Sequence, residues 1–358
     1  MKAGKILSAL IGASVILSGL SGMDGQIVQD CPGYNSWSFV QTMGNNLVCV
    51  YSRGSAHTID EPARGVYARI SEDGGKTWNK ESVVCNLPDC GNVPVGKGLD
   101  QNGNMLLWIR NAGGNYPTRL RHELYESADG IHFRRIAQPK LDPVPVQITD
   151  IFPVPGVGLM SLWFAGRYRE DPNHSWGTLV SSDNGRTWQQ NVIESGLELR
   201  DWPTEQSAVY LGDGKILAIG RCEGGVPKPV RAQFQLESED YGKTWKRFRT
   251  NITDVLASTP SLIFDPSTGI VFQYYYHRSA GQLKCRAVPA GSIWNNPLGW
   301  PEPMIVAAGS KDAHHAGNAN AAVYGDQHCV TFYSGNQNHT SVLVKLIQPV
   351  QRDGKDKQ

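Results

Sequence analysis

The sequence has little charge and no excess of either sign. Its 358 residues include 34 Lys and Arg and 33 Asp and Glu, which gives a formal net charge of +1. Charged residues make up 19% of the chain, below the usual quarter. Because acidic and basic residues are nearly equal in number, the chain has no large net positive charge to attract nucleic acid or an anionic membrane. We therefore expect neither of them as a partner.

Cysteine is also scarce. Seven cysteines in 358 residues are too few for a disulfide scaffold, and only Cys85 and Cys90 form a local pair. The chain contains no C-x2-C pair and no H-E-x-x-H helix motif, which are the common signals of a protein-bound zinc ion. The sequence therefore predicts no metal site and no cofactor.

Long apolar runs are absent except near the N-terminus. Lys2 and Lys5 precede the apolar segment Ile6–Leu20. A short basic region before such a segment is typical of a signal peptide, and the segment is too short to span a membrane. We predict a signal peptide at residues 1–22 and a secreted or periplasmic protein. The alternative is a first strand or an attachment segment of a larger assembly.

Glycine and aromatic residues, in contrast, are plentiful. Glycine accounts for 39 residues, and the chain has 10 Trp, 13 Tyr and 9 Phe. Apolar residues reach 40%, which excludes a disordered chain. This composition favours many short strands joined by many turns.

The pattern S-x-D-x-G-x-T-W recurs along the chain. Three full copies and one partial copy begin at residues 71, 181, 238 and 127, so successive copies are 56, 54 and 57 residues apart. Asp and Gly form a tight turn in which the Asp side chain accepts backbone N–H bonds, and the aromatic residue packs beneath it. We interpret these residues as structural. The tryptophans of the motif, which we expect to be largely buried, are Trp78, Trp188 and Trp245.

A second pattern has the same period. Apolar strands end in arginines at positions 53, 110, 167, 221 and 278, spaced 57, 57, 54 and 57 residues apart. Each follows a shorter strand and a Gly/Asp turn, which indicates four strands per unit. About six such units fit into the chain, so we predict one all-β domain over residues 23–350. Its expected fold is a six-bladed β-propeller of four-stranded antiparallel blades, closed by a strand from the other terminus. Residues 351–358 form a polar tail.

In such a propeller, the ends of the second strands lie on one face. The five arginines are therefore expected to surround one channel mouth, where guanidinium groups can bind a carboxylate or a sulfate in a bidentate manner.

The repeat resembles the Asp-box of sialidases and related propellers. Residues 204–221, T-E-Q-S-A-V-Y-L-G-D-G-K-I-L-A-I-G-R, resemble the sialidase stretch N-E-S-x-V-V-E-L-x-D-G-x-L-x-x-x-x-R. The resemblance implies that Glu205 assists the nucleophile and that Arg221 grips the substrate carboxylate, as does Arg278 at the matching position of the next blade. It also implies an acid/base carboxylate in the loop after Arg53, where Asp60 and Glu61 are the candidates.

The chain departs from the sialidase pattern at two positions. Sialidases begin with F/Y-R-I-P, whereas Asn35–Phe39 contains no arginine. Asn318 stands where sialidases have their nucleophilic tyrosine, and an amide cannot form the covalent intermediate. Either one of Tyr274–Tyr276 replaces that tyrosine, or Glu205 activates water directly.

Histidines and tyrosines in the same loops suggest a second chemistry. A His or Tyr beside an arginine can remove the C5 proton of a uronic acid, which is the reaction of a lyase. The His candidates are His57, His277, His314 and His315. The alternative interpretation of the Tyr triplet is a strand with alternating core and surface positions.

The sequence thus predicts a carbohydrate-active propeller, a sialidase-like exo-glycoside hydrolase that acts on an acidic glycan. The alternatives are a polysaccharide lyase and a non-catalytic glycan-binding or receptor-binding propeller. Oligomeric state is left open. The candidate catalytic residues are Glu205, Asp60, Tyr276 and His277, and the candidate substrate-binding residues are Arg53, Arg110, Arg167, Arg221, Arg278, Asn318 and His315.

Overall fold

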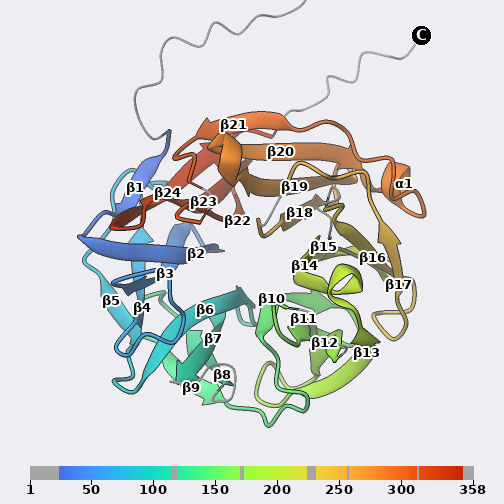
Figure 1. The fold of residues 1–358 in the computed structure, drawn as a ribbon, viewed down its shortest axis with the longest axis horizontal. Helices are drawn as coiled ribbons and strands as arrows, with labels where there is room; N and C mark the ends of the chain where they lie inside the picture. The colour runs from blue at the N-terminus through green and yellow to red at the C-terminus, as the bar shows by residue number, and fades with distance from the viewer. Residues whose placement is uncertain are drawn as a thin grey trace, which may run out of the picture.

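The computed structural model describes residues 24–113, 120–169, 173–223, 231–255, 258–312 and 314–349. The predicted signal peptide at 1–22 and the predicted tail at 351–358 lie outside the described residues. Within them the chain forms a ring of sheets in which consecutive strands are antiparallel (Figure 1). The prediction of an all-β propeller with four-stranded blades is confirmed.

Four sheets are separate four-stranded blades, each built from consecutive strands. Their first strands, β6, β10, β14 and β18, lie nearest to the centre, and later strands lie farther out (Figure 1). The first two blades are β6 (Cys90–Leu99), β7 (Met105–Gly113), β8 (Leu120–Ser127), β9 (Arg134–Ala137), and β10 (Gln147–Val154), β11 (Gly158–Ala165), β12 (His174–Ser181), β13 (Gln189–Leu197). The next two are β14 (Pro203–Gly212), β15 (Lys215–Cys222), β16 (Phe234–Ser238), β17 (Lys246–Arg249), and β18 (Ser261–Asp265), β19 (Ile270–His277), β20 (Gln282–Pro289), β21 (Met304–Ala308).

The remaining strands form one eight-stranded sheet, so the prediction of six separate blades is corrected. The strands β2 and β24 pair in parallel at two positions, Gly33 with His339 and Tyr34 with Thr340, and this short contact joins the two ends of the ring. The first strand, β1, pairs with β24, as expected for closure by the other terminus. The sheet comprises β1 (Gln26–Gln29), β2 (Gly33–Met43), β3 (Asn46–Gly54), β4 (Gly65–Ser71), β5 (Ser82–Cys85), β22 (Gly317–Tyr324), β23 (Gln327–Asn336) and β24 (His339–Ile347).

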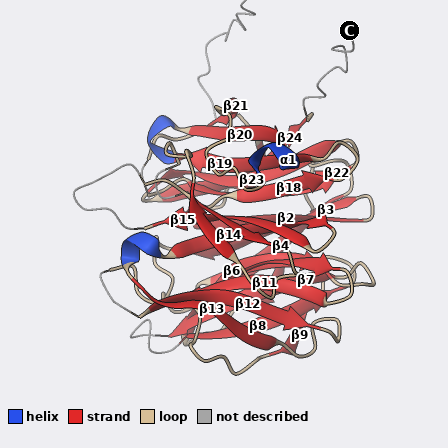
Figure 2. Ribbon diagram, turned by 90° about the vertical axis from the view of Figure 1, so that its right-hand side faces the viewer, coloured by secondary structure: helices blue, strands red, loops and turns tan. Residues whose placement is uncertain are grey.

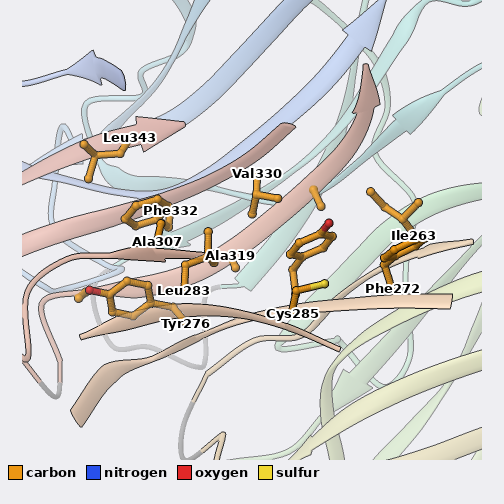
Figure 3. Close-up of a cluster of buried hydrophobic side chains, with 13 residues drawn as sticks. Ile263, Phe272, Tyr276, Leu283, Cys285, Ala307, Ala319, Val330, Phe332 and Leu343 are labelled. Atoms are coloured by element: carbon orange, nitrogen blue, oxygen red, sulfur yellow. The ribbon is translucent and has the colours of Figure 1, made fainter. Parts of the chain in front are cut away.

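The core lies between neighbouring sheets. Each second strand is buried along nearly its whole length, because both of its faces meet an adjacent blade; β7 is buried at all nine positions. One cluster joins Tyr276 and Leu283 to Val330, Phe332 and Leu343 across the gap between two sheets (Figure 3). This packing on both faces explains why the second strands read as continuous apolar runs in the sequence.

The Asp-boxes lie in the hairpins between third and fourth strands, at the perimeter of the ring. In the third box Asp183 accepts hydrogen bonds from the backbone N–H of Thr187 (2.8 Å), from the Thr187 hydroxyl (2.6 Å) and from Ser181 (2.9 Å). Between β20 and β21 the short helix α1 (Ala290–Ile293) takes the place of a box. Short 3₁₀ turns at Leu199–Asp201 and Arg278–Ala280 complete the regular structure.

The expectation that the box tryptophans are largely buried is wrong in degree. Trp78, Trp188 and Trp245 are half-buried. The indoles of Trp188 and Trp245 donate to the carbonyl of the glycine three residues earlier, at 3.0 Å. Each ring packs against a buried cluster beside its hairpin and is only partly covered by it.

Viewed from the side, the strands stack as tilted layers (Figure 2). Among the described residues no helix has the length and apolar character needed to cross a membrane.

Candidate functional site

Three inner strands each carry a residue with left-handed backbone at a point where strand pairing slips. Trp37, Glu205 and Asn318 have φ angles of +48°, +46° and +49°. Such bulges redirect a side chain, and a left-handed non-glycine residue costs on the order of 1–3 kcal/mol. All three side chains line one pocket of about 330 Å³. The slips fall between Ser36 and Phe39 in β2, Thr204 and Ser207 in β14, and Gly317 and Asn320 in β22.

The second strands supply cations to the same pocket. Arg110 on β7, Arg221 on β15 and Arg278, directly after β19, all line it. Two carboxylates, Glu205 and Glu223, line it as well. The described lining therefore has one more arginine than it has acidic residues, which favours an anionic ligand. The remaining lining residues include His57, Ile59, Tyr168, Thr259, His314 and Asn320.

Arg221 holds both acidic residues in place. Its guanidinium donates to Glu205 at 2.9 Å and to Glu223 at 2.9 Å, and Glu223 also accepts from the Thr204 hydroxyl. The Thr259 hydroxyl donates to the second oxygen of Glu205 at 2.5 Å. Burial alone would raise the pKa of Glu205, but Arg221, Thr259 and Arg278 outweigh it and lower that pKa. Glu205 is therefore an ionised base at neutral pH.

Arg278 and Asn318 form the neighbouring part of the pocket. The guanidinium of Arg278 donates to the amide oxygen of Asn318 at 3.2 Å. Gly317 makes this approach possible: its φ is +138°, and a Cβ there would lie 2.6 Å from the Nε atom of Arg278. Arg278 is 8% exposed, so the guanidinium has little contact with bulk water.

The loop from Ser55 to Arg64 covers one side of the pocket. His57 and Ile59 line the pocket, whereas Asp60 and Glu61 do not. Glu61 instead accepts from the Ser55 backbone N–H at 2.8 Å and pairs with the buried Arg64 at 3.0 Å. The guanidinium of Arg64 also lies 4.9 Å from the ring centre of Trp37. Asp60 follows Ile59 directly, and its side chain is only partly buried.

The structure brings together some of the predicted arginines and separates others. Arg110, Arg221 and Arg278 meet in the pocket with Glu205 and Asn318. Arg53 does not line it, because its guanidinium pairs with Glu81 at 2.8 Å and lies 4.4 Å from the ring centre of Tyr67. Arg167 is exposed beyond the end of β11.

Tyr276 and His277 are not brought into the pocket. Tyr276 is fully buried, stacks on Phe332 and donates its hydroxyl to the carbonyl of Ser310 at 2.8 Å (Figure 3). Burial raises its pKa to about 12. Tyr274 and Tyr275 are buried too and do not line the pocket, so their placement favours the other alternative, in which Glu205 activates water. His277 contacts Lys284 at 3.0 Å and Ser279 at 3.1 Å.

Sequence reasoning missed several residues of the site. Glu223 lies two residues after Arg221 and is the second carboxylate that binds this guanidinium. No sequence motif indicated this pairing. Trp37 lies in the stretch where the arginine of the sialidase pattern is missing. The sequence identified this stretch but did not predict that Trp37 lines the pocket. His315, in contrast, was predicted as a substrate-binding residue; it lies just outside the lining, with its Nδ1 atom 3.1 Å from the hydroxyl of Tyr34.

No group of three or more His, Cys, Asp or Glu side chains is arranged to hold a metal ion in the described part of the chain.

The chain was compared with known proteins at the levels of sequence and of structure. No described sequence family and no curated protein matches it. A protein of unknown function from Dyadobacter fermentans has a TM-score of 0.68 at 16% identity, covering 89% of this chain and 98% of that one.

Sialidases are among the similar structures. The Hadza microbial sialidase Hz136 has a TM-score of 0.66 at 16% identity and covers 89% of this chain. The Trypanosoma rangeli sialidase, solved in complex with sialic acid, has a TM-score of 0.63 at 12% identity and covers 88%. The match spans 66% of the first sialidase and 54% of the second. At these identities the likeness shows the fold alone, and the chain is an all-β propeller of the sialidase-like type.

Proposed function

We propose that this propeller binds an acidic sugar in its pocket and hydrolyses the glycosidic bond of that sugar. The observation that carries the proposal is the meeting of Arg110, Arg221 and Arg278 with Glu205 in one pocket. The excess of arginine suits a carboxylate on the substrate. The similar sialidases, one of them holding sialic acid, support a carbohydrate as the ligand.

In this proposal Glu205 acts as the general base. Water attacks the anomeric carbon and gives one proton to Glu205, while the glycosidic C–O bond breaks and its electron pair stays on the leaving oxygen. The leaving oxygen then takes a proton from an acid on the loop after Arg53. The sequence predicts Asp60 as that acid, but in this loop it is His57 that lines the pocket. Asn318 cannot act as a nucleophile, so direct attack by water should invert the anomeric centre.

A second candidate activity is the elimination expected of a lyase. One observation favours it: His57 lines the pocket, and burial together with the neighbouring Arg278 lowers its pKa to about 4. A neutral imidazole could take the C5 proton of a uronic acid whose carboxylate lies near Arg278. The C4–O bond would then break, leaving a C4–C5 double bond and an alcohol after protonation.

Product analysis tests both activities. The purified protein is incubated in ¹⁸O-labelled water with sialylated oligosaccharides and with uronate polymers. Hydrolysis adds one labelled oxygen to a product, whereas elimination adds none and creates an ultraviolet-absorbing unsaturated uronate. Glu205→Gln is the inactive comparison for hydrolysis, and Arg167→Gln is the matched control outside the pocket. Binding without either product would overturn the enzymatic proposal and favour a glycan-binding propeller.

We also propose export to the periplasm or the medium, from the basic and apolar residues at 1–22. Mass spectrometry of the mature protein should find a chain that lacks this segment. A mature chain that retains Met1 and stays in the cytoplasm would contradict this.

A further inference from the structure

A chain of three ring side chains leads away from the pocket. Tyr34 on β2 is fully buried. Its hydroxyl lies 2.6 Å from the Nδ1 atom of His57 and 3.1 Å from the Nδ1 atom of His315. The hydroxyl also approaches the carbonyl of His314 at 3.4 Å. The ring centres of His57 and His315 are 6.0 Å apart, so Tyr34 bridges two imidazoles that do not bond to each other.

His57 offers its second ring nitrogen to the pocket. Its Nδ1 atom is occupied by Tyr34, and within the described residues its Nε2 atom has no hydrogen-bond partner and is not sealed from solvent. His57 lines the pocket together with Arg278 and Trp37. The ring of Trp37 packs 5.1 Å from the imidazole and fixes its orientation. The Nε2 atom is therefore the atom that a substrate can reach.

The hydrogen bonds among these three groups can run in either of two directions. The hydroxyl of Tyr34 has one proton, so it can donate to one imidazole while it accepts from the other. If His57 takes a proton at Nε2, its Nδ1 proton can pass to Tyr34 and the phenol proton can pass to His315. His57 ends neutral and His315 becomes an imidazolium. The reverse sequence delivers a proton from His57 Nε2 to a leaving oxygen.

The surrounding charges control this transfer. Burial lowers the pKa of His57, and Arg278, His315, Arg64 and His314 lower it further. At the far end, Asp312 accepts from the backbone N–H of His315 at 2.9 Å, and His315 and His314 help to lower the pKa of Asp312. An anion beside Arg278 would offset the charge of that arginine. His57 would then accept a proton more readily when the substrate is bound.

We propose that His57, Tyr34 and His315 form a proton relay, in which His57 is the acid/base residue of the pocket and anion binding near Arg278 favours its protonation. This inference rests on the proposed function for its substrate. It assigns to His57 the role that the sialidase resemblance places on the carboxylate at Asp60. It requires no change in the position of Glu205, which acts on the water.

Nitrogen NMR of the histidines tests the relay without any ligand. The chain has nine histidines, and His57→Gln assigns the signal of His57. In the wild-type protein we expect the ¹⁵N signals of His57 and His315 to change in the same titration step, with opposite protonation of their Nδ1 atoms. In Tyr34→Phe, which keeps the ring, the two should titrate separately. Independent titration in the wild type would overturn the relay.

The charge coupling has its own matched pair of variants. Arg278→Gln should raise the pKa of His57 by about one unit, because a like charge is removed. Arg167→Gln should leave it unchanged, because Arg167 lies outside the pocket. An unchanged pKa in Arg278→Gln would contradict the coupling.

Kinetics separates the relay from the proposed function. If the wild type hydrolyses an acidic glycoside, His57→Gln should lose about 10²–10⁴-fold on a natural glycan. It should lose far less on an aryl glycoside, whose leaving group needs no proton. Equal losses on both would overturn the role of His57. If the wild type converts nothing but the coupled titration is present, the proposed function fails and the relay stands as proton-linked anion binding.

Discussion

Glu205 is held ionised by a guanidinium and a hydroxyl, in a strained backbone position that points it into the pocket. We expect Glu205→Gln to reduce kcat by about 10²–10⁴-fold and to leave the Kd for the substrate nearly unchanged. Gln keeps the shape and can still accept from Arg221. Calorimetric titration of the inactive variant checks the second part. A variant with near-normal kcat would show that the base lies elsewhere.

The Thr259 hydroxyl donates to Glu205 and helps to lower its pKa. Glu205 works as a base, so activity should fall as pH drops through its pKa. In Thr259→Val that pKa rises, and the acid limb of the kcat/KM profile should move to higher pH. The basic limb, which does not depend on Glu205, is the internal control. If the acid limb does not shift, it does not report the ionisation of Glu205.

Asn318 binds Arg278 but has no nucleophilic role in this pocket. Asn318→Ala should change kcat by only a few-fold. It should cost about 1 kcal/mol of folding free energy, because Asn tolerates the left-handed backbone better than Ala does. Denaturant unfolding and steady-state kinetics measure the two effects. A loss of hundreds-fold in kcat with normal folding would restore a direct chemical role for this position.

At the scale of strands and hairpins, the hydrogen bonds of the Asp-box stabilise the fold and lie away from the pocket. Asp183→Ala removes the acceptor of two hydrogen bonds from Thr187 and one from Ser181. We expect a loss of about 1–3 kcal/mol in unfolding free energy with unchanged kcat/KM. Asp183→Asn, which keeps one side-chain oxygen, is the matched control and should lose less. A selective loss of activity would show that the perimeter hairpins communicate with the channel.

The repeat length predicted the strands, the hairpins and the common face of the second-strand ends. It could not predict where each arginine points. Arg53 and Arg278 occupy equivalent positions in the sequence pattern, yet Arg53 turns to Glu81 and Arg278 turns into the pocket. The choice depends on partners from other strands. The bulge at Trp37 and the pairing of Glu223 with Arg221 are tertiary features of the same kind.

For the whole molecule, buried neutral histidines predict sensitivity to acid. Burial lowers the pKa of His328 to about 4 and that of His122 to about 3. Each contributes stability that is present above the unfolded pKa of about 6.5. That stability is lost as pH falls toward the folded pKa, because the unfolded chain binds more protons. The unfolding temperature should therefore drop between pH 6.5 and pH 4.

His122 offers a direct check, because neither of its ring nitrogens has a partner among the described residues. His122→Phe should be at least as stable as the wild type at pH 7. At pH 4.5 its free energy of unfolding should exceed that of the wild type by about 1 kcal/mol or more, because the buried imidazole must stay neutral where the unfolded chain takes up a proton. His132→Phe, on an exposed hairpin, is the control. Equal acid sensitivity in both variants would assign the effect to other groups.

The closure of the ring also has a consequence for the order of folding. Gln26 pairs with Val344, and Gly33 with His339, so these contacts join residues more than 300 positions apart. Closing so long a loop carries a large entropic cost before any contact compensates for it, and non-local pairing slows folding. The separate blades are built from consecutive strands and can form early. The seam between β24, β1 and β2 should form last, and a chain still emerging from the ribosome must hold β1 unpaired until β24 arrives.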